Sequence, residues 1–281
     1  MNRERSNGFL NLSVQKKLWF AAAAAAYIVL FLWLPVYDLP FSDFLTAHAS
    51  EWFFQLGRRA GQLPALLVPA FCIHALGRFQ KRKWYTEIIC FLLCFAAALT
   101  IVIPHDNYAI EGCITLAAAI AIFLILIRIP LPEDTPSSRR LLWIGILTPL
   151  IGIVIVEGIK YVWNRPRYLA ILQEGAKFQN WRTINGFAIK SDLYHSFPSA
   201  HTFDAACSFL IVLLPELYEK YPRNSSLLFI CPLVFTVFVA ASRIMGGMHF
   251  ISDVMAGAGI FAIIFVILLF LNSRHTQQDS E

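Results

Sequence analysis

A histidine and an aspartate in the C-terminal part of the chain have the types and the spacing of a catalytic pair. His249 and Asp253 stand four residues apart in "SRIMGGMHFISD", so in a helix their side chains would share one face. A carboxylate that accepts from one imidazole nitrogen leaves the other nitrogen free and basic, and such a histidine can attack phosphorus. The alternative is that His249 and Asp253 only satisfy each other's hydrogen bonds at the membrane interface. A carboxylate inside so apolar a segment favours a functional role instead.

A second cluster, "FPSAHT", has the signature of a helix start. Pro198 suits the first turn, and the free N–H groups of a helix N-terminus suit a phosphate. Ser199 adds a hydroxyl donor, and His201 adds a titratable group. The alternative is that Ser199 only caps the helix while His201 sits at an interface.

Several cations lie near these clusters: Lys160, Arg165, Arg167 and Arg243. They have three possible uses, which are anchoring to lipid phosphates, pairing with carboxylates such as Glu157, and binding an anionic substrate. If a helix continues past Lys160, then Arg167 lies two turns further on nearly the same face, although Pro166 interrupts that pattern.

Together the clusters supply two histidines, a carboxylate and several donors for phosphoryl oxygens. This set can transfer a phosphoryl group without a metal, so we expect neither a cofactor nor a metal site. The cysteines are predicted to be small core residues rather than disulfide or metal ligands. They lie inside or at the edge of apolar segments, at positions 72, 90, 94, 113, 207 and 231.

The composition indicates how these residues are positioned. The chain has 281 residues, of which 58% are hydrophobic and 15% charged, and its mean hydropathy is +0.61. Soluble domains are nearer half apolar and a quarter charged, so this is a membrane protein. Eight segments approach the length of about 20 residues that a bilayer requires. They are residues 18–36, 62–77, 85–104, 112–129, 141–161, 201–217, 226–243 and 250–272.

These segments predict an all-α fold, a polytopic helical bundle that forms a single integral membrane domain over residues 1–281. The basic leader and the basic connections at residues 77–85, 128–140 and 218–226 indicate that both termini are cytoplasmic. The polar clusters then fall on the outer face. The first apolar run is predicted to be an uncleaved anchor. Residues 41–61 are predicted to form an amphipathic helix at the outer interface, with a structured loop as the alternative.

The polar clusters also resemble the type 2 phosphatidic acid phosphatases, membrane enzymes related to vanadium haloperoxidases. The family motifs are Lys-x6-Arg-Pro, Pro-Ser-Gly-His and Ser-Arg-x5-His-x3-Asp. The third motif is intact from Ser242 to Asp253, and the second is intact except for Ala200 in place of glycine. The first runs from Lys160 to Arg167, with Tyr168 in place of proline. A competing register at Arg165-Pro166 leaves only four residues after Lys160, so we choose Arg167.

The resemblance implies a role for each matching residue. His249 would be the nucleophile, Asp253 would orient it, and His201 would protonate the leaving oxygen. The phosphoryl oxygens would be held by Lys160, Arg167, Ser199, Arg243 and the backbone N–H of Ala200. The resemblance also implies a six-helix core, with residues 141–272 as the catalytic half and one extra helix pair within residues 1–140.

The expected function is therefore hydrolysis of a lipid-linked phosphate or diphosphate through a phosphohistidine, at the outer face of a bacterial cytoplasmic membrane. The candidate substrates are polyprenyl diphosphate, phosphatidic acid, phosphatidylglycerol phosphate and lipid A. The long loop after residue 168, which contains Phe178 and Trp181, is expected to shape the access of the substrate headgroup to the site. The expected partners are this substrate and membrane lipids, with no nucleic acid, and the sequence does not indicate an oligomeric state. The alternatives are a lipid phosphotransferase that uses the same site and a non-catalytic transporter in which Glu157, Lys160 and Asp253 form a polar pathway.

Overall fold

The computed structural model describes residues 14–80, 84–102, 108–218, 220–221 and 226–278. Most of the basic leader and parts of two basic connections, at residues 81–83, 219 and 222–225, lie outside these residues. Within them the chain is helical and contains no strand. The helices are α1 (Val14–Trp33), α2 (Asp38–Ala47), α3 (Glu51–Gly61), α4 (Leu63–Phe79), α5 (Trp84–Ile101), α6 (Tyr108–Leu126), α7 (Pro136–Trp163), α8 (Tyr168–Glu174), α9 (Ala200–Ala206), α10 (Leu214–Leu217), α11 (Leu227–Met245) and α12 (Ile251–Gln278).

Eight helical stretches in the described part of the chain are long and apolar enough to cross a membrane. This confirms the predicted polytopic bundle. The stretch after residue 200 is continuous but not uniform, because a 3-10 segment, Cys207–Leu213, joins α9 to α10. Large apolar side chains such as Val154, Val234 and Ile263 are exposed on the outside of the bundle, as expected where lipid takes the place of water.

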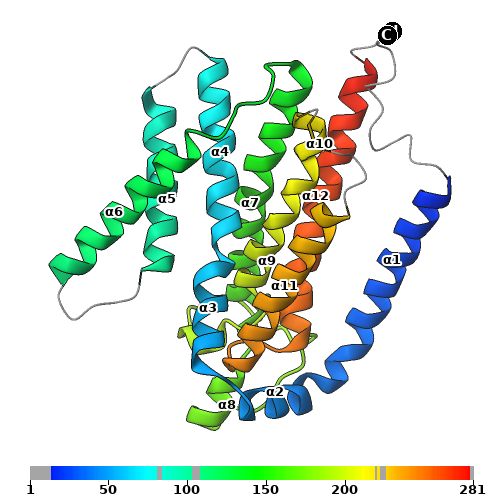
Figure 1. Ribbon diagram of the computed structural model, residues 1–281. Helices are drawn as coiled ribbons and strands as arrows, with labels where there is room; N and C mark the ends of the chain where they lie inside the picture. The colour runs from blue at the N-terminus through cyan, green and yellow to red at the C-terminus, as the bar shows by residue number, and fades with distance from the viewer. Residues whose placement is uncertain (1–13, 81–83, 103–107, 219, 222–225, 279–281) are drawn as a thin grey trace.

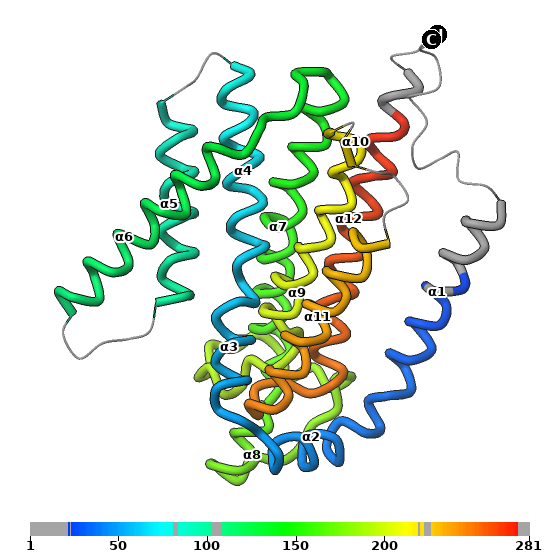
Figure 2. Tube along the Cα trace, viewed as in Figure 1, coloured from blue at the N-terminus to red at the C-terminus, as the bar shows by residue number. Residues whose placement is uncertain are grey.

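The prediction of one amphipathic helix over residues 41–61 is wrong in part. The helix is interrupted near His48, so that α2 lies across one end of the bundle while α3 runs along it (Figure 1). The tube in Figure 2 shows that α3 and α4 follow one another along the bundle, and together they form one membrane-length stretch, Glu51–Phe79. Since α3 packs against α11, it belongs to the bundle rather than to its surface.

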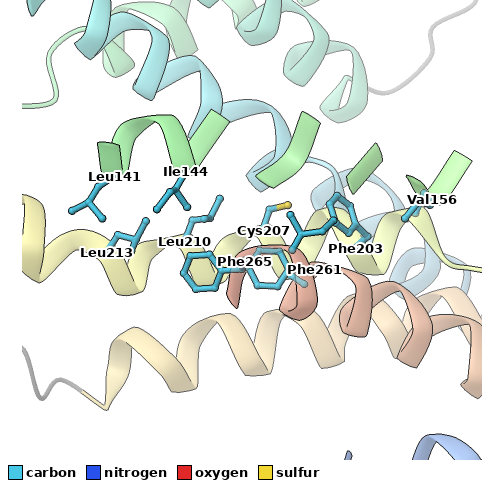
Figure 3. Packing of buried hydrophobic residues seen from close by; sticks show 12 residues of the cluster. Leu141, Ile144, Val156, Phe203, Cys207, Leu210, Leu213, Phe261 and Phe265 are labelled. Carbon is cyan, nitrogen blue, oxygen red and sulfur yellow. The ribbon is translucent and has the colours of Figure 1, made fainter. Parts of the chain in front are cut away.

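The centre of the bundle is formed by α7, α9, α11 and α12, with α3 and α4 beside them (Figure 1). Its largest apolar cluster joins α7, the stretch from α9 to Leu213, and α12 (Figure 3). The ring of Phe203 lies so close to Gly152 of α7 that a Cβ at Gly152 would overlap it. Small residues that let helices approach closely are a common device in membrane bundles, where packing holds the helices together.

The remaining long helices are peripheral. Figure 1 shows α5 and α6 at one edge of the bundle, where α5 packs against α4 and α6 packs against α5. At the opposite edge, α1 is tied to α12 by a hydrogen bond that the Tyr27 hydroxyl donates to the Met255 carbonyl.

All six cysteines are free, and four of them are buried, as their predicted role requires. The other two, Cys113 and Cys231, are exposed.

Candidate active site

The last turn of α7 and the segment that follows it bring two predicted cations to one end of the bundle. Thr135 caps the start of α7 by accepting a hydrogen bond from the Ser138 N–H at 3.1 Å. The helix ends at Trp163, because Asn164 adopts a left-handed conformation with φ 44°. Lys160 therefore lies in the last turn of α7, whereas Arg167 lies beyond it and is the N-cap residue of α8. The helix does not continue to Arg167, so Lys160 and Arg167 do not share a helix face, in agreement with the interruption expected at Pro166.

A cavity of about 450 Å³ lies at this end of the bundle. The predicted site residues line it, except Ser199 and Asp253, which are buried behind it. Its full lining is Phe54, Arg58, Gln62, Ile153, Glu157, Lys160, Arg167, Asp192, Ala200, His201, Asp204, Arg243, Met248 and His249. The two histidines that stand 48 residues apart in the sequence thus face one space.

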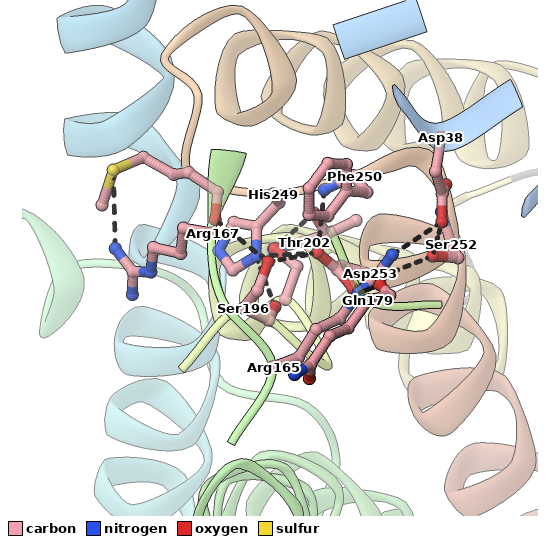
Figure 4. A network of polar contacts seen from close by, with 12 residues as sticks. Asp38, Arg165, Arg167, Gln179, Ser196, Thr202, His249, Phe250, Ser252 and Asp253 are labelled. Carbon is pink, nitrogen blue, oxygen red and sulfur yellow. Dashed lines mark hydrogen bonds and ion pairs between the residues drawn. The ribbon is translucent and has the colours of Figure 1, made fainter. Parts of the chain in front are cut away.

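His249 lies in the turn before α12 rather than within that helix, so the expected shared helical face is wrong. Its Nδ1 lies 2.6 Å from the backbone carbonyl oxygen of Ser196 (Figure 4). The distance from Nδ1 to the nearer oxygen of Asp253 is 3.8 Å, which is too long for a hydrogen bond. Because a carbonyl can only accept, Nδ1 carries the proton, and Nε2 keeps its lone pair for a reaction in the cavity.

Burial lowers the pKa of His249 to about 4, an effect that outweighs the opposing effect of Asp253. The imidazole is therefore neutral at neutral pH. A neutral ring with its Nε2 lone pair free is the form of histidine that acts as a nucleophile.

Asp253 organises the backbone around His249. Its carboxylate accepts from the Ser196 hydroxyl at 2.5 Å and from the Phe250 N–H at 2.8 Å (Figure 4). The same carboxylate forms an ion pair of 2.5 Å with Arg165. Asp253 therefore holds the two segments that flank the imidazole, and it acts on His249 mainly through Ser196 rather than by a direct hydrogen bond.

Arg165 is a structural residue of this network and does not line the cavity. It is fully buried, and besides Asp253 it bonds Asp38 of α2 at 2.8 Å and the Ser252 hydroxyl at 2.7 Å. Its guanidinium also lies over the ring of Phe250, 4.3 Å from the ring centre. The choice of Arg167 over Arg165 as the cation that faces the site agrees with this placement.

At the start of α9, Ser199 has the capping position. Its hydroxyl lies 3.0 Å from the Thr202 hydroxyl and accepts from the Thr202 N–H at 3.4 Å. The backbone N–H of Ser199 donates to the Asp253 carbonyl at 2.9 Å, which joins α9 to α12. Ser199 is thus used as a cap, whereas the next two residues, Ala200 and His201, line the cavity.

The cavity cations differ in how far the protein satisfies them. Lys160 is paired with Glu157 at 2.6 Å, and Arg167 is paired with Asp192 at 2.8 Å. One nitrogen of Arg167, Nε, and two nitrogens of Arg243, Nε and Nη1, are buried without a hydrogen-bond partner among the described residues. Arg243 is therefore the cation most in need of an anion, because buried donors without partners are costly.

Tyr168 stands at the first position of α8, with Arg167 as N-cap. Proline is favoured at that position because its missing N–H is not needed there, and the helix starts there with a tyrosine as well. The Tyr168 hydroxyl donates to Asp43 of α2 at 2.6 Å, so the substitution adds a link between α2 and the site.

The expected role of Phe178 and Trp181 at the entrance is wrong. Phe178 packs against Phe250, with ring centres 5.3 Å apart, and Trp181 stacks on Phe197 at 5.9 Å. Neither lines the cavity, so both support the site from behind.

Sequence reasoning missed the contribution of the N-terminal half. Phe54, Arg58 and Gln62 line the cavity, and their spacing of four residues was a signal for one helix face. Nothing in the local sequence marked Asp38 as a partner of Arg165. The Ser196 carbonyl that orients His249 left no signal either, because every residue type has a backbone carbonyl.

Comparisons with known proteins found a family and two relatives. The family model of the PAP2 superfamily matches residues 141–276, which include all three motifs. Human sphingosine-1-phosphate phosphatase 2 is 30% identical over 134 residues, 48% of this chain and 30% of that protein. Phosphatidylglycerophosphatase B of Bacillus subtilis (strain 168) is 33% identical over 75 residues, 26% of this chain and 37% of that protein. The chain thus spans about a third of the length of these relatives. No solved structure matches the chain. The match confirms the resemblance drawn from the motifs.

Proposed function

We propose that this chain, whose residues 141–276 match the PAP2 superfamily, is an integral membrane phosphatase that hydrolyses a lipid-linked phosphate or diphosphate. The observation that carries the proposal is the meeting of His201, His249 and Arg243 in one cavity at the end of a membrane bundle. A lipid substrate would keep its tail in the bilayer while its phosphate enters this cavity. The names of both relatives also describe phosphatases of lipid phosphates.

In the first step, the lone pair of His249 Nε2 attacks the phosphorus, and a P–N bond forms. The bond between phosphorus and the oxygen of the leaving group breaks, and that oxygen takes a proton from His201. Lys160, Arg167 and Arg243 face the same cavity and would balance the charge on the phosphoryl oxygens, together with the Ala200 N–H. The Ser196 carbonyl stabilises the proton on Nδ1 while the ring becomes positively charged.

In the second step, a water molecule attacks the phosphohistidine. His201, now neutral, takes a proton from this water, the P–N bond breaks, and inorganic phosphate leaves. His249 returns to its neutral form and His201 to its protonated form, so the cycle closes. Since cationic side chains supply the charge, we propose that the reaction needs no metal ion.

The site lies at the end of the bundle that carries α2 and α8, opposite to the connection between α6 and α7 (Figure 1). That connection carries Arg128, and the start of α7 carries Arg139 and Arg140. By the positive-inside rule we place this connection and both termini in the cytoplasm, and the cavity at the outer face. We also propose α5 and α6 as the extra helix pair, because they pack outside the centre of the bundle.

The alternatives have less support from the geometry. A transport pathway through Asp253 conflicts with its complete burial and its pairing with Arg165. A phosphotransferase would use the same residues, with a second lipid in place of water. Phosphate release by the purified protein in detergent, measured on the four candidate lipid substrates, tests the proposal. Release of free phosphate from at least one supports it, whereas label found only in a second lipid indicates transfer, and no reaction with any of them contradicts it.

A further inference from the structure

One face of α3 brings a further cation into the cavity. Phe54, Arg58 and Gln62 follow one another at intervals of four residues, and all three line the space into which His249 opens. Arg58 lies outside residues 141–276, so the superfamily match does not include it. The mechanism described above does not use it either.

Close packing fixes this face relative to His201. Gly57 approaches the side chain of Ser242 on α11 so closely that a Cβ would overlap it. A Cβ on Gly61 would lie 2.9 Å from a methyl carbon of Val239 and 3.5 Å from the backbone oxygen of His201. The glycine face of α3 therefore packs against α11 and the start of α9, while Arg58 and Gln62 line the cavity that His201 also lines. The leaving group of the proposed reaction lies in this cavity, next to His201.

The cavity is lined by four cationic side chains and by three acidic ones, which are Glu157, Asp192 and Asp204. Lys160 and Arg167 are already paired with carboxylates, Glu157 and Asp192. Arg243 keeps donors without partners, and Arg58 is near enough to act electrostatically on Arg243. Two arginines that face one space repel each other, and an anion that spans both relieves that repulsion. The cavity volume of about 450 Å³ is in the usual range for ligand pockets, about 300–1,000 Å³.

We propose that Arg58 and Gln62 form a second phosphate subsite, and that the substrate is a lipid diphosphate. This inference rests on the proposed function and names its substrate class. The terminal phosphoryl group lies against His249 and Arg243, and the phosphate that carries the lipid lies against Arg58 and Gln62. When the terminal P–O bond breaks, its electron pair stays on the bridging oxygen, which takes a proton from His201. The leaving group is then a lipid monophosphate, whose charge Arg58 balances.

The test compares a prenyl diphosphate with the monophosphate of the same prenyl chain. For each protein the ratio of the two kcat/KM values is measured in detergent. Arg58→Gln is expected to lower the ratio of diphosphate to monophosphate about tenfold or more, the effect of losing one charge-assisted contact. The matched control is Arg59→Gln, because Arg59 donates to the Ile101 carbonyl at 3.0 Å and does not line the cavity. This control is expected to keep the wild-type ratio.

The outcomes separate the subsite from the proposed function. An unchanged ratio in Arg58→Gln overturns the subsite, even though hydrolysis itself supports the phosphatase. If the wild type hydrolyses neither compound, the proposed function fails in this assay, and the subsite is tested by binding of methylenediphosphonate in calorimetry. Weaker binding to Arg58→Gln than to the wild type and Arg59→Gln supports the subsite. Equal binding to all three proteins, or binding to none of them, overturns it.

Discussion

Asp38 and Arg165 form an ion pair that has no exposed surface, with the carboxylate oxygen and the guanidinium nitrogen 2.8 Å apart. The two residues are 127 positions apart in the chain. Arg165 also forms an ion pair with Asp253, and Asp38 also accepts a hydrogen bond from the Ser252 N–H at 2.9 Å. The first turn of α2 therefore helps to hold the segment on which His249 stands, so the N-terminal half is part of the site's framework.

Replacing Asp38 with asparagine is expected to destabilise the protein and to lower its activity. The change removes the carboxylate that accepts from Arg165 and Ser252 and sets an amide N–H against one of these buried donors, and a buried donor left without a partner costs about 1–3 kcal/mol. Thermal unfolding and phosphate release in detergent measure the two effects. The control is Glu51→Gln, because Glu51 is exposed and bonds only the nearby Gln55 among the contacts described here. An Asp38→Asn protein with the Tm and activity of the control would show that the pair is dispensable.

Arg165 and Arg167 are the two candidates for the arginine of the first motif, and substituting them is expected to have different effects on stability and activity. Arg165→Met should lower the Tm strongly, because it removes the partner of two buried carboxylates. Arg167→Met should leave the Tm within a few degrees and lower kcat/KM about tenfold or more, because Arg167 faces the cavity. Unfolding curves and kinetics of both variants check this division. The reverse pattern would mean that Arg165 is the cation that binds phosphate.

The low pKa of His249 predicts a change of stability with pH. Its pKa is lowered from 6.5 to about 4 in the folded chain, so below pH 6.5 the unfolded chain binds a proton that the folded chain does not. This contribution to stability is complete above pH 6.5 and is lost as the pH falls toward 4. The Tm should therefore fall more steeply between pH 7 and pH 4.5 in the wild type than in His249→Gln. Parallel curves would contradict the pKa and the neutral nucleophile that it implies.

Activity is expected to persist when divalent metals are removed. The cavity brings Arg58, Lys160, Arg167 and Arg243 to the reacting group, and these residues supply the charge that a metal would otherwise supply. Phosphate release in excess EDTA, compared with release in added Mg²⁺, measures this. A strict requirement for Mg²⁺ would contradict the proposal that cationic side chains supply this charge.

Much of the architecture could be predicted because membrane spans and motif residues leave local signals. Apolar length predicted the eight spans, and the motif spacing found the residues from Lys160 to His249 that line the cavity. The contributions of Asp38 and Arg58 could not be predicted in this way. Each depends on which helices meet in three dimensions, more than 100 residues apart, and neither residue stands in a motif.

The orientation of His249 is a second feature that could not be predicted from the sequence. The spacing to Asp253 predicted a direct hydrogen bond within one helix, but α12 begins two residues after His249, at Ile251. The acceptor is the Ser196 carbonyl, which has no signature in the sequence. Residue types and spacing thus identified the chemical groups, while the hydrogen bonds between them depend on where the helices end.

The central claim is that His249 accepts the phosphoryl group, and trapping of the intermediate tests it most directly. The protein is mixed with a substrate labelled with ³²P in its terminal phosphate, quenched in alkali, where phosphohistidine survives, and digested for peptide mapping. The account predicts label on the peptide that contains His249. His249→Ala is expected to show no label and no phosphate release, while it keeps a cooperative unfolding transition. Label on another residue, or phosphate release by His249→Ala at the wild-type rate, would contradict the account.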